Sequence, residues 1–415
     1  MNMPKLKALT VAISAAMATS SALALDFGQK VEQQAKAHSV SLFGTVGTLD
    51  ASSTIQAPAT AGGCDLITLA QGLTCSVVSE QDNLAAKIDM MVLYPNDANP
   101  THIVACNEAG SGNGSVQRIS LATGFVENIV SSGLTSCDPV EITPWGTVVF
   151  GEENGASGRM FEILNPLTTT DVTVSGSGAA TATSDNAHVR YLPALGQLSF
   201  EGISILPNGV ALYQDENRPS KGVGGGGYFK FIPTTAWSGG APIDNLEDSP
   251  LAGGRVFALR LGRNSGNTDF GQGNFVGRGV WVEVTDGNFG APTTTAGVDR
   301  LDLRAAANTL KATQGYRPED QDIDKKAAAM GNVRVCGTNT GQDVPADEAN
   351  GDNNFGTTFC LTDGTLAESA TLNTTTQTVN GVTYNLNEGE GTSIPEYQIL
   401  VQHHLDFGMP DNIAY

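Results

Sequence analysis

The sequence contains an internal repeat, whose clearest copies are residues 142–154 (ITPWGTVVFGEEN) and 205–217 (ILPNGVALYQDEN). Each copy has a Pro-x-Gly segment, a mostly apolar run, and two acids followed by Asn. Pro-x-Gly favours a turn, the apolar run favours a buried strand, and the acids stand where that strand ends. A third, weaker copy begins at Pro100. In all three copies an acid lies eight residues after the proline: Glu108, Glu152 and Asp215.

Repeated strand units of this kind are typical of β-propellers, whose blades are small sheets with their inner strands around a central channel. The 49 glycines and the low aromatic content of 6% also favour many short strands and tight turns. The sequence therefore predicts an all-β, six-bladed β-propeller with a few short helices in insertions. We expect the acids at equivalent strand ends to converge on one mouth of the channel.

Residues 1–24 have the features of a secretory signal peptide: early lysines, a short apolar run and a small-x-small site at 22–24. A twin-arginine pair is absent, so the signal is of the Sec type and predicts a periplasmic or secreted protein. No later apolar stretch is long enough to anchor the chain in a membrane. We assign residues 25–80 to an N-terminal helix and a cysteine-containing loop, and residues 81–415 to the propeller catalytic domain. Because no strand follows the last turn, we expect the last blade to be incomplete at the C-terminus.

The net charge of −21 argues against nucleic acid as a partner, because a polyanion needs a basic footprint. The charge fits either a solvated acidic surface or a carboxylate-rich cation site. Ca²⁺ requires about six to eight oxygen ligands, and acids at repeat-equivalent strand ends could supply them. The five histidines are scattered, which disfavours zinc. The candidates for a cation site are Glu152, Glu153, Glu201, Asp215, Glu216, Glu319 and Asp320.

Six cysteines in an oxidising compartment suggest three disulfides. Cys64 with Cys75 would close a short loop, and Cys336 with Cys360 is the second pair that we expect. Two alternatives remain for the others: either Cys106 and Cys137 form the third disulfide, or Cys137 is a metal ligand.

Several motifs, in this order, resemble those of the PhoX-type alkaline phosphatases. The Thr-Pro-Trp-Gly-Thr segment at 143–147 and the Arg-Pro-Glu segment at 317–319 are the most specific. The others are Cys137, Glu152-Glu153-Asn154, Phe200-Glu201-Gly202, Asp215-Glu216, Tyr228-Phe229-Lys230-Phe231 and Pro410-Asp411-Asn412-Ile413. Together these segments extend over roughly residues 95–415.

The resemblance implies a β-propeller whose central pocket holds Ca²⁺ and Fe³⁺ and hydrolyses small phosphomonoesters. Arg317 would bind the phosphate oxygens with its planar set of donors. Cys137 and Glu319 would belong to the catalytic centre. The metal ligands that the resemblance and the acidic pairs imply are Cys137, Glu152, Glu153, Glu201, Asp215, Glu216, Glu319 and Asp411.

The sequence departs from the family pattern at two places. The interval from Cys137 to the Thr-Pro-Trp segment is one residue longer, which could move the thiolate away from a metal. Cys106-Asn107-Glu108 stands where the family has Asn-His-Glu.

Three functions are compatible with the sequence. The first is an exported, monomeric phosphomonoesterase. The alternatives are a non-catalytic calcium-binding propeller that acts as a surface or binding module, and a calcium-dependent lactonase. Arg317 beside Glu319 favours the first.

Overall fold

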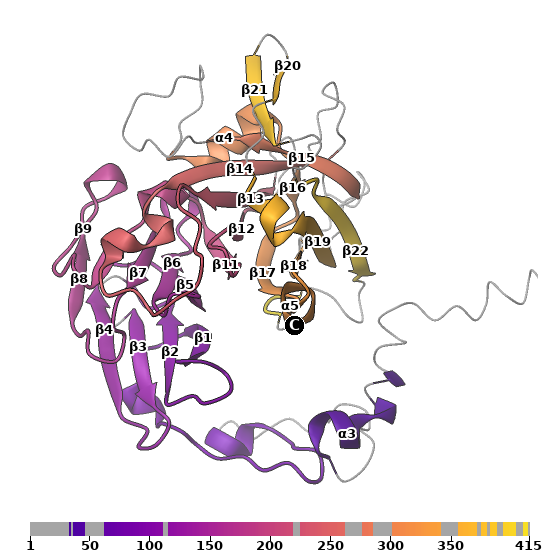
Figure 1. Cartoon of the computed structure of the whole chain (residues 1–415). Helices are drawn as coiled ribbons and strands as arrows, with labels where there is room; N and C mark the ends of the chain where they lie inside the picture. The colour runs from indigo at the N-terminus through magenta and orange to yellow at the C-terminus, as the bar shows by residue number, and fades with distance from the viewer. Residues whose placement is uncertain are drawn as a thin grey trace, which may run out of the picture. The chain divides into compact units, whose positions relative to one another are not determined.

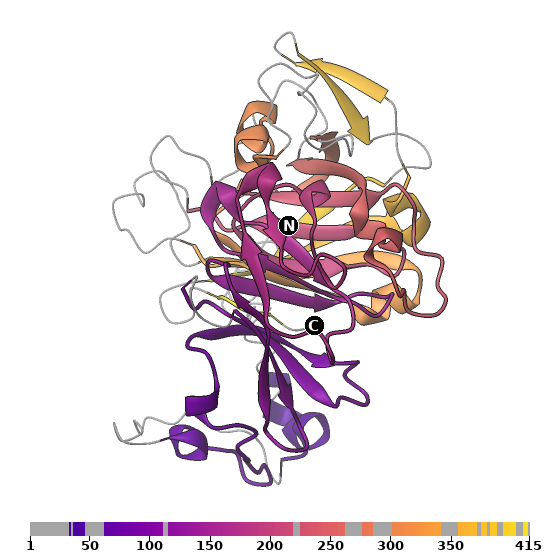
Figure 2. The same cartoon turned by 90° about the vertical axis from the view of Figure 1, so that its left-hand side faces the viewer.

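The structure is a computed structural model (Figures 1 and 2). The structure describes residues 33–34, 36–45, 62–110, 115–218, 225–261, 276–284, 301–341, 356–371, 375–379, 382–387, 393–403 and 410–413. The chain divides into two compact units, Met1–Val77 and Val78–Tyr415. The first unit contains α3 (Ser39–Phe43) and the Cys64–Cys75 disulfide. The predicted signal peptide lies outside the described residues.

The second unit is built from sets of four antiparallel strands, which we call blades 1 to 4. Blade 1 consists of β1 (Ile88–Tyr94), β2 (His102–Asn107), β3 (Val116–Ser120) and β4 (Val126–Ser132). Blade 2 consists of β5 (Cys137–Ile142), β6 (Val148–Glu152), β7 (Met160–Ile163) and β10 (Val189–Tyr191). Each strand pairs with the next in the order given.

Blades 3 and 4 belong to one continuous sheet in which β15 (Gly277–Glu283) pairs with the last strand of each. Blade 3 consists of β11 (Phe200–Ile205), β12 (Ala211–Asp215), β13 (Gly226–Pro233) and β14 (Gly254–Leu261). Blade 4 consists of β17 (Pro318–Ile323), β18 (Asn332–Asn339), β19 (Thr357–Thr365) and β22 (Glu396–Gln402).

The first strands of the blades lie next to one another: β1 contacts β5, β5 contacts β11, and β11 contacts β17 (Figure 1). Successive four-stranded blades with neighbouring inner strands are the arrangement of a β-propeller, so the predicted fold class is confirmed. The number of six blades stays a prediction.

The remaining elements are short and lie between or beside the blades. The strands are β8 (Val172–Ser175), β9 (Ala182–Thr183), β16 (Gln314–Gly315), β20 (Thr375–Val379) and β21 (Val382–Asn387). The helices are α4 (Leu303–Leu310), α5 (Lys325–Ala329) and α6 (Leu366–Ser369). None of the helices that the structure describes has the length and apolar character to span a bilayer.

An apolar seam fills the space between each pair of neighbouring blades. Because side chains alternate along a strand, one strand supplies two seams. On β6, Val148 and Phe150 pack into the seam between blades 1 and 2, whereas Val149 packs into the seam between blades 2 and 3. On β12, Tyr213 and Leu212 likewise face opposite seams. This explains why the repeated strands read as continuous apolar runs in the sequence.

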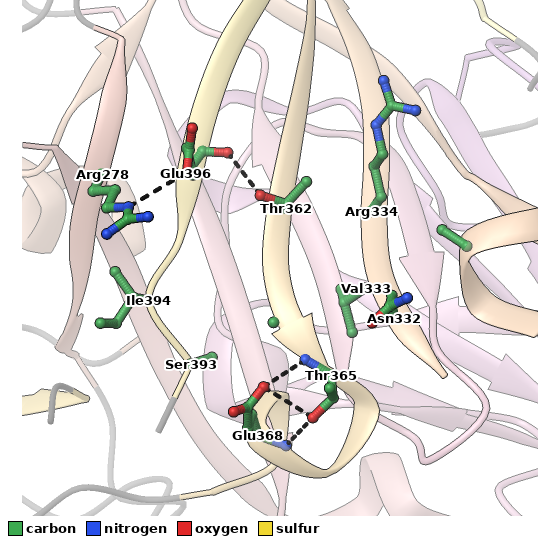
Figure 3. Close-up of a pocket in the computed structure, with 12 residues that line it drawn as sticks. Arg278, Asn332, Val333, Arg334, Thr362, Thr365, Glu368, Ser393, Ile394 and Glu396 are labelled. Atoms are coloured by element: carbon green, nitrogen blue, oxygen red, sulfur yellow. Dashed lines mark hydrogen bonds and ion pairs between the residues drawn. The ribbon is translucent and has the colours of Figure 1, made fainter. Parts of the chain in front are cut away.

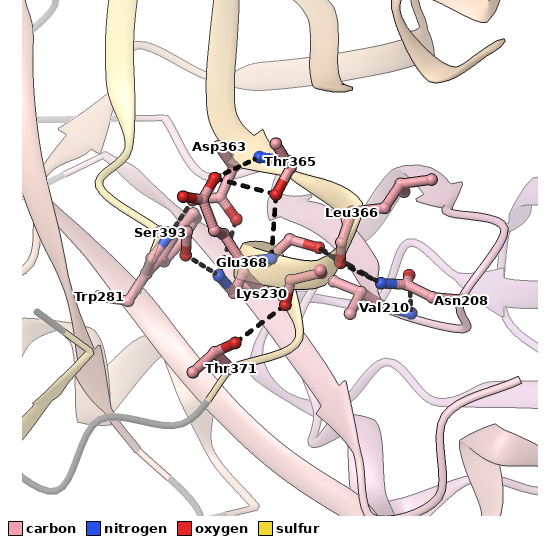
Figure 4. A network of polar contacts seen from close by, with 12 residues as sticks. Asn208, Val210, Lys230, Trp281, Asp363, Thr365, Leu366, Glu368, Thr371 and Ser393 are labelled. Carbon is pink, nitrogen blue, oxygen red and sulfur yellow. Dashed lines mark hydrogen bonds and ion pairs between the residues drawn. The ribbon is translucent and has the colours of Figure 1, made fainter. Parts of the chain in front are cut away.

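The seam between blades 3 and 4 also contains a buried ion pair (Figure 4). Lys230 Nζ on β13 lies 2.7 Å from Asp363 Oδ2 on β19 and donates to Ser393 Oγ, also at 2.7 Å. Trp281 Nε1 donates to the other oxygen of Asp363 at 2.8 Å. Both charged side chains are fully buried, so the pair ties the two blades together through groups that satisfy each other.

Candidate metal centre

In each blade the first strand, which we call the inner strand, has an acid as its second residue. The first residue of the inner strand pairs with the last residue of the next strand, and a register shift follows. These pairs are Ile88–Asn107, Cys137–Glu152, Phe200–Asp215 and Pro318–Asn339. The acids at equivalent positions are therefore Asp89, Asp138, Glu201 and Glu319.

A second ring of residues follows the ends of the second strands: Glu108, Glu153, Glu216 and Thr340. The Glu153 carboxyl is hydrogen-bonded to both Glu108 and Glu216. The strand register also corrects one detail of the sequence repeat. Glu108 is equivalent to Glu153 and Glu216, one position later than the proline spacing predicts, because Asn107 takes the pairing position in blade 1.

The two rings bring carboxylates to within metal-binding distance. Oxygens of Asp138, Glu153 and Glu201 lie within 4.8 Å of one another, and so do oxygens of Glu201, Glu319 and Asp411. Asp138, Glu201 and Glu319 are only 2%, 5% and 0% exposed. Within the described part of the chain, no donor reaches Asp138 Oδ1, Glu201 Oε2 or Glu319 Oε2. Buried anionic oxygens without donors are costly, and a cation among them would remove that cost.

The electrostatics point the same way. Burial is the main reason why the pKa of Glu153 is raised to about 10 and the pKa of Glu319 to about 8. Burial, together with the neighbouring acids, also raises the pKa values of Asp138 and Glu201 well above their usual range. Carboxylates packed this closely cannot all be ionised without a cation among them; in its absence, protons must neutralise some of them.

Arg317 lies beside the acids and brings a positive charge to the cluster. Its Nη1 is 2.8 Å from Glu319 Oε1, and its Nε also pairs with Glu216 Oε1. The side chain is 21% exposed, so one guanidinium is positioned by two acids of the cluster and still reaches solvent. It adopts a positive φ of 52°, at the turn that leads into β17.

Two predicted metal ligands are instead engaged by arginines. Both oxygens of Glu152 accept from Arg159, at 2.6 and 2.7 Å, and Thr135 N adds a further bond. Both oxygens of Asp215 accept from Arg304, at 2.7 and 2.6 Å, and Ser199 N adds a bond there. These repeat-equivalent acids therefore hold the second strands in place through their arginine partners, and metal binding by them stays a prediction. Their neighbours Glu153 and Glu216 face the cluster.

Asp411 comes to the cluster on a segment held against blade 4. Thr340 Oγ1 donates to Pro410 O at 2.9 Å, and Thr338 Oγ1 donates to Asp411 O. The backbone N–H of Ile413 donates to Asp320 Oδ2 at 3.2 Å. Asp320 is thus used to hold this segment, whereas its neighbour Glu319 enters the cluster.

The sulfur of Cys137 is bonded to Cys106, and Cys336 is bonded to Cys360. Of the two alternatives for Cys137, the structure therefore shows the disulfide. A disulfide sulfur carries no thiolate charge that could bind a metal. Sequence reasoning missed Asp89 and Asp138, and it placed Glu108 among the repeat acids without including it in the candidate metal ligands. A signal for Asp138 was present in the spacing: it lies six residues before Pro144, as Glu201 lies six residues before Pro207.

Two pockets open elsewhere on this unit. One, of about 540 Å³, includes Arg278, Arg334 and Glu368 in its lining and contains none of the predicted site residues (Figure 3). The other, of about 490 Å³, lies along β1, β5 and β17 and includes Glu141 and Asp320.

A family model described as alkaline phosphatase PhoX matches residues 140–415. The chain belongs to the PhoX family. The match begins within β5 and covers the rest of blade 2, blades 3 and 4 and the segment that carries Asp411. It includes Glu153, Glu201 and Glu319 of the acid cluster but not Asp138. None of the curated proteins compared matches this PhoX-family chain.

Several solved structures resemble this PhoX-family chain at low identity. PhoX of Pseudomonas fluorescens, in complex with vanadate, is 14% identical, with 72% of this chain and 66% of that chain covered and a TM-score of 0.43. Regucalcin from Agrobacterium tumefaciens is 12% identical, with 76% and 77% covered and a TM-score of 0.25. An aldose sugar dehydrogenase from Streptomyces coelicolor is 10% identical, with 78% and 97% covered and a TM-score of 0.27. The chain therefore spans just under two thirds of the PhoX structure, and at these scores the likenesses carry no functional weight.

Proposed function

We propose that this protein is an exported, metal-dependent phosphomonoesterase that releases phosphate from small organic phosphoesters. The observation that carries the proposal is the set of buried carboxylates from equivalent strands with Arg317 at its edge. Membership of the PhoX family supports a phosphatase rather than a non-catalytic calcium-binding module. A binding module has no need of a guanidinium held next to the metal ligands.

Calcium is the metal that fits the donor set. The buried oxygens of Asp138, Glu201 and Glu319 are hard ligands without donors, and Ca²⁺ prefers several such oxygens. Glu153, Glu216 and Asp411 would complete the set. Iron held by a Cys137 thiolate does not fit, because that sulfur is in a disulfide. We therefore derive no step through iron.

Bound calcium would neutralise phosphate charge and lower the cost of bringing a dianion to an acidic cluster. The residues of the chain then divide the remaining work. Arg317 donates to the non-ester oxygens of the phosphate through its planar fork. Glu319 orients Arg317 through their 2.8 Å ion pair, and its other oxygen, to which no described residue donates, would be available to hold the cation. Cys137 makes no contact with substrate in this scheme, and its part is to fix the backbone beside Asp138.

The remaining parts of the proposal rest on the sequence. The Sec-type signal at residues 1–24 and the disulfides favour the periplasm or the outside of the cell. We propose a monomer that takes a small phosphoester and has no nucleic acid partner, in keeping with the net charge of −21.

The test is hydrolysis of p-nitrophenyl phosphate by the purified chain, before and after calcium chelation and after calcium is restored. We expect chelation to abolish turnover and calcium to recover it. Arg317→Ala should lower kcat/KM by roughly 10²–10³-fold, the usual effect of losing a donor to transition-state charge. Arg278→Ala is the matched control, because it removes an exposed arginine from the separate pocket.

Bis(p-nitrophenyl) phosphate serves as the diester comparison. Preference for the monoester supports the proposal, and equal or faster diester cleavage would redefine the substrate class. Calcium binding without turnover of either ester would refute the phosphatase and leave the binding module.

A further inference from the structure

We propose that Asp138 takes the ligand position beside Cys137, so that the centre is an all-oxygen cation site braced by the Cys106–Cys137 disulfide. The inference deepens the proposed function and rests on its metal centre. It assigns a ligand that the motif comparison in the sequence gives to a different residue.

The strand register carries the first step of the argument. Cys137 pairs with Glu152 in the same way that Phe200 pairs with Asp215. Cys137 is therefore the equivalent of Phe200, and Asp138 is the equivalent of Glu201. By this repeat, the side chain that faces the centre belongs to the second residue of the strand.

The burial of the side chains agrees with the register. Phe200 packs in the apolar seam between blades 2 and 3, and Cys137 packs in the seam between blades 1 and 2 with Val116, Val140 and Phe150. The next side chain along each strand points to the other side. Asp138 accordingly reaches Glu153 and Glu201, with an oxygen to which no described residue donates.

The disulfide ties together the backbones of two acids. Cys137 directly precedes Asp138, and Cys106 lies two residues before Glu108 at the end of β2. A covalent bond between these strands limits how far the two carboxylates can separate by mutual repulsion. The cysteine pair thus acts on the centre by positioning ligands, and the ligands themselves are carboxylates.

The donor set has a chemical consequence. Thiolates select soft metals, whereas carboxylates suit calcium, magnesium and manganese. We therefore expect metal content to depend on Asp138 and to be independent of the cysteine sulfur.

The experiment compares the wild type, Asp138→Asn, the double variant Cys106→Ser/Cys137→Ser, and Asp244→Asn as a matched exposed-acid control. Bound metals are measured by mass spectrometry, and calcium affinity by calorimetry on chelator-treated protein. We expect Asp138→Asn to lose at least 10-fold in calcium affinity, and the control to match the wild type. The double variant should keep the calcium stoichiometry, with weaker affinity from the lost brace. When iron is added to the wild type, its absorbance spectrum should show no thiolate-to-metal band.

Wild-type calcium affinity in Asp138→Asn would overturn the inference. So would a thiolate-to-metal band in the wild type that disappears, together with the bound metal, only in the double cysteine variant. If the double variant does not fold, the Asp138→Asn arm and a thiol titration of the wild type decide the question. A free, metal-bound Cys137 thiol would refute the inference. Turnover of p-nitrophenyl phosphate is measured in parallel. Calcium binding that depends on Asp138 but gives no turnover would refute only the proposed phosphatase. Turnover that is unchanged in Asp138→Asn would refute only this inference.

Discussion

Glu152 and Glu153 are adjacent in sequence, yet the structure predicts opposite consequences when each is changed to glutamine. Glu152 is fully buried and gives both oxygens to Arg159, which is itself 7% exposed. Glu152→Gln leaves the arginine charge buried and unpaired, and turns an amide N–H₂ toward groups that are all donors. Breaking a buried pair in this way costs about 3–5 kcal/mol. At about 2 °C per kcal/mol for a large domain, the melting temperature should fall by roughly 6–10 °C.

Glu153→Gln should behave differently because the pKa of Glu153 is raised to about 10, mainly by burial. In chelator at pH 7 this carboxyl is already neutral, so the isosteric amide should change the melting temperature little. With calcium restored, the wild type should gain stability by mass action, and Glu153→Gln should lose most of that gain.

Both variants are melted by circular dichroism with chelator and with excess calcium. The reverse pattern would refute the division of roles: a stable Glu152→Gln protein that has lost its response to calcium, beside a Glu153→Gln protein that still responds to calcium.

Three further predictions follow from the buried charges. Burial raises the pKa of Glu141 to about 8, so folding takes up a proton there and the wild type should lose stability as pH rises from about 5 to 8. Urea unfolding at both ends of this range should show a weaker pH dependence in Glu141→Gln; an unchanged dependence would place the titration elsewhere. Lys230→Met should lower the free energy of unfolding by about 3–5 kcal/mol, because it leaves the buried charge of Asp363 without its partner. The double variant Lys230→Met/Asp363→Leu should recover much of this loss. A double variant no more stable than the single one would show that the pair is needed for more than charge balance. Glu201→Gln should weaken calcium binding by at least tenfold in calorimetry, with its fold unchanged by circular dichroism, and wild-type affinity would remove Glu201 from the centre.

The fold could be predicted because the repeat records a physical requirement. A blade between two others must be apolar on both faces, so β6 and β12 read as continuous apolar runs after a Pro-x-Gly turn. The helix α4 begins where Asp302 caps its first turn by accepting from Ala305 N. The number of blades could not be counted from three recognisable copies.

The site was predictable only in part. Proline spacing identifies where a strand ends but does not say which of two adjacent acids turns inward. Glu152 and Glu153 differ in their partners, and Arg159 lies seven residues from Glu152 in the sequence. Asp89 and Asp138 were missed because they precede the turn, in the inner strand, whereas the repeat was recognised by the acids that follow it. Their inward direction depends on the first pair of the strand and the register shift after it.

The equivalent positions in the four blades also bear on how such a centre can change over generations. Each blade contributes one residue from its inner strand and one from the end of its second strand, and blade 4 already has Thr340 where the others have glutamate. No single position defines the centre, so one donor can be exchanged while the neighbouring blades keep the cavity in place. In this chain an aspartate one residue beyond Cys137 faces the cluster, and the cysteine is paired with Cys106. The same duplicated framework could in this way pass from one metal preference to another without ever losing its fold.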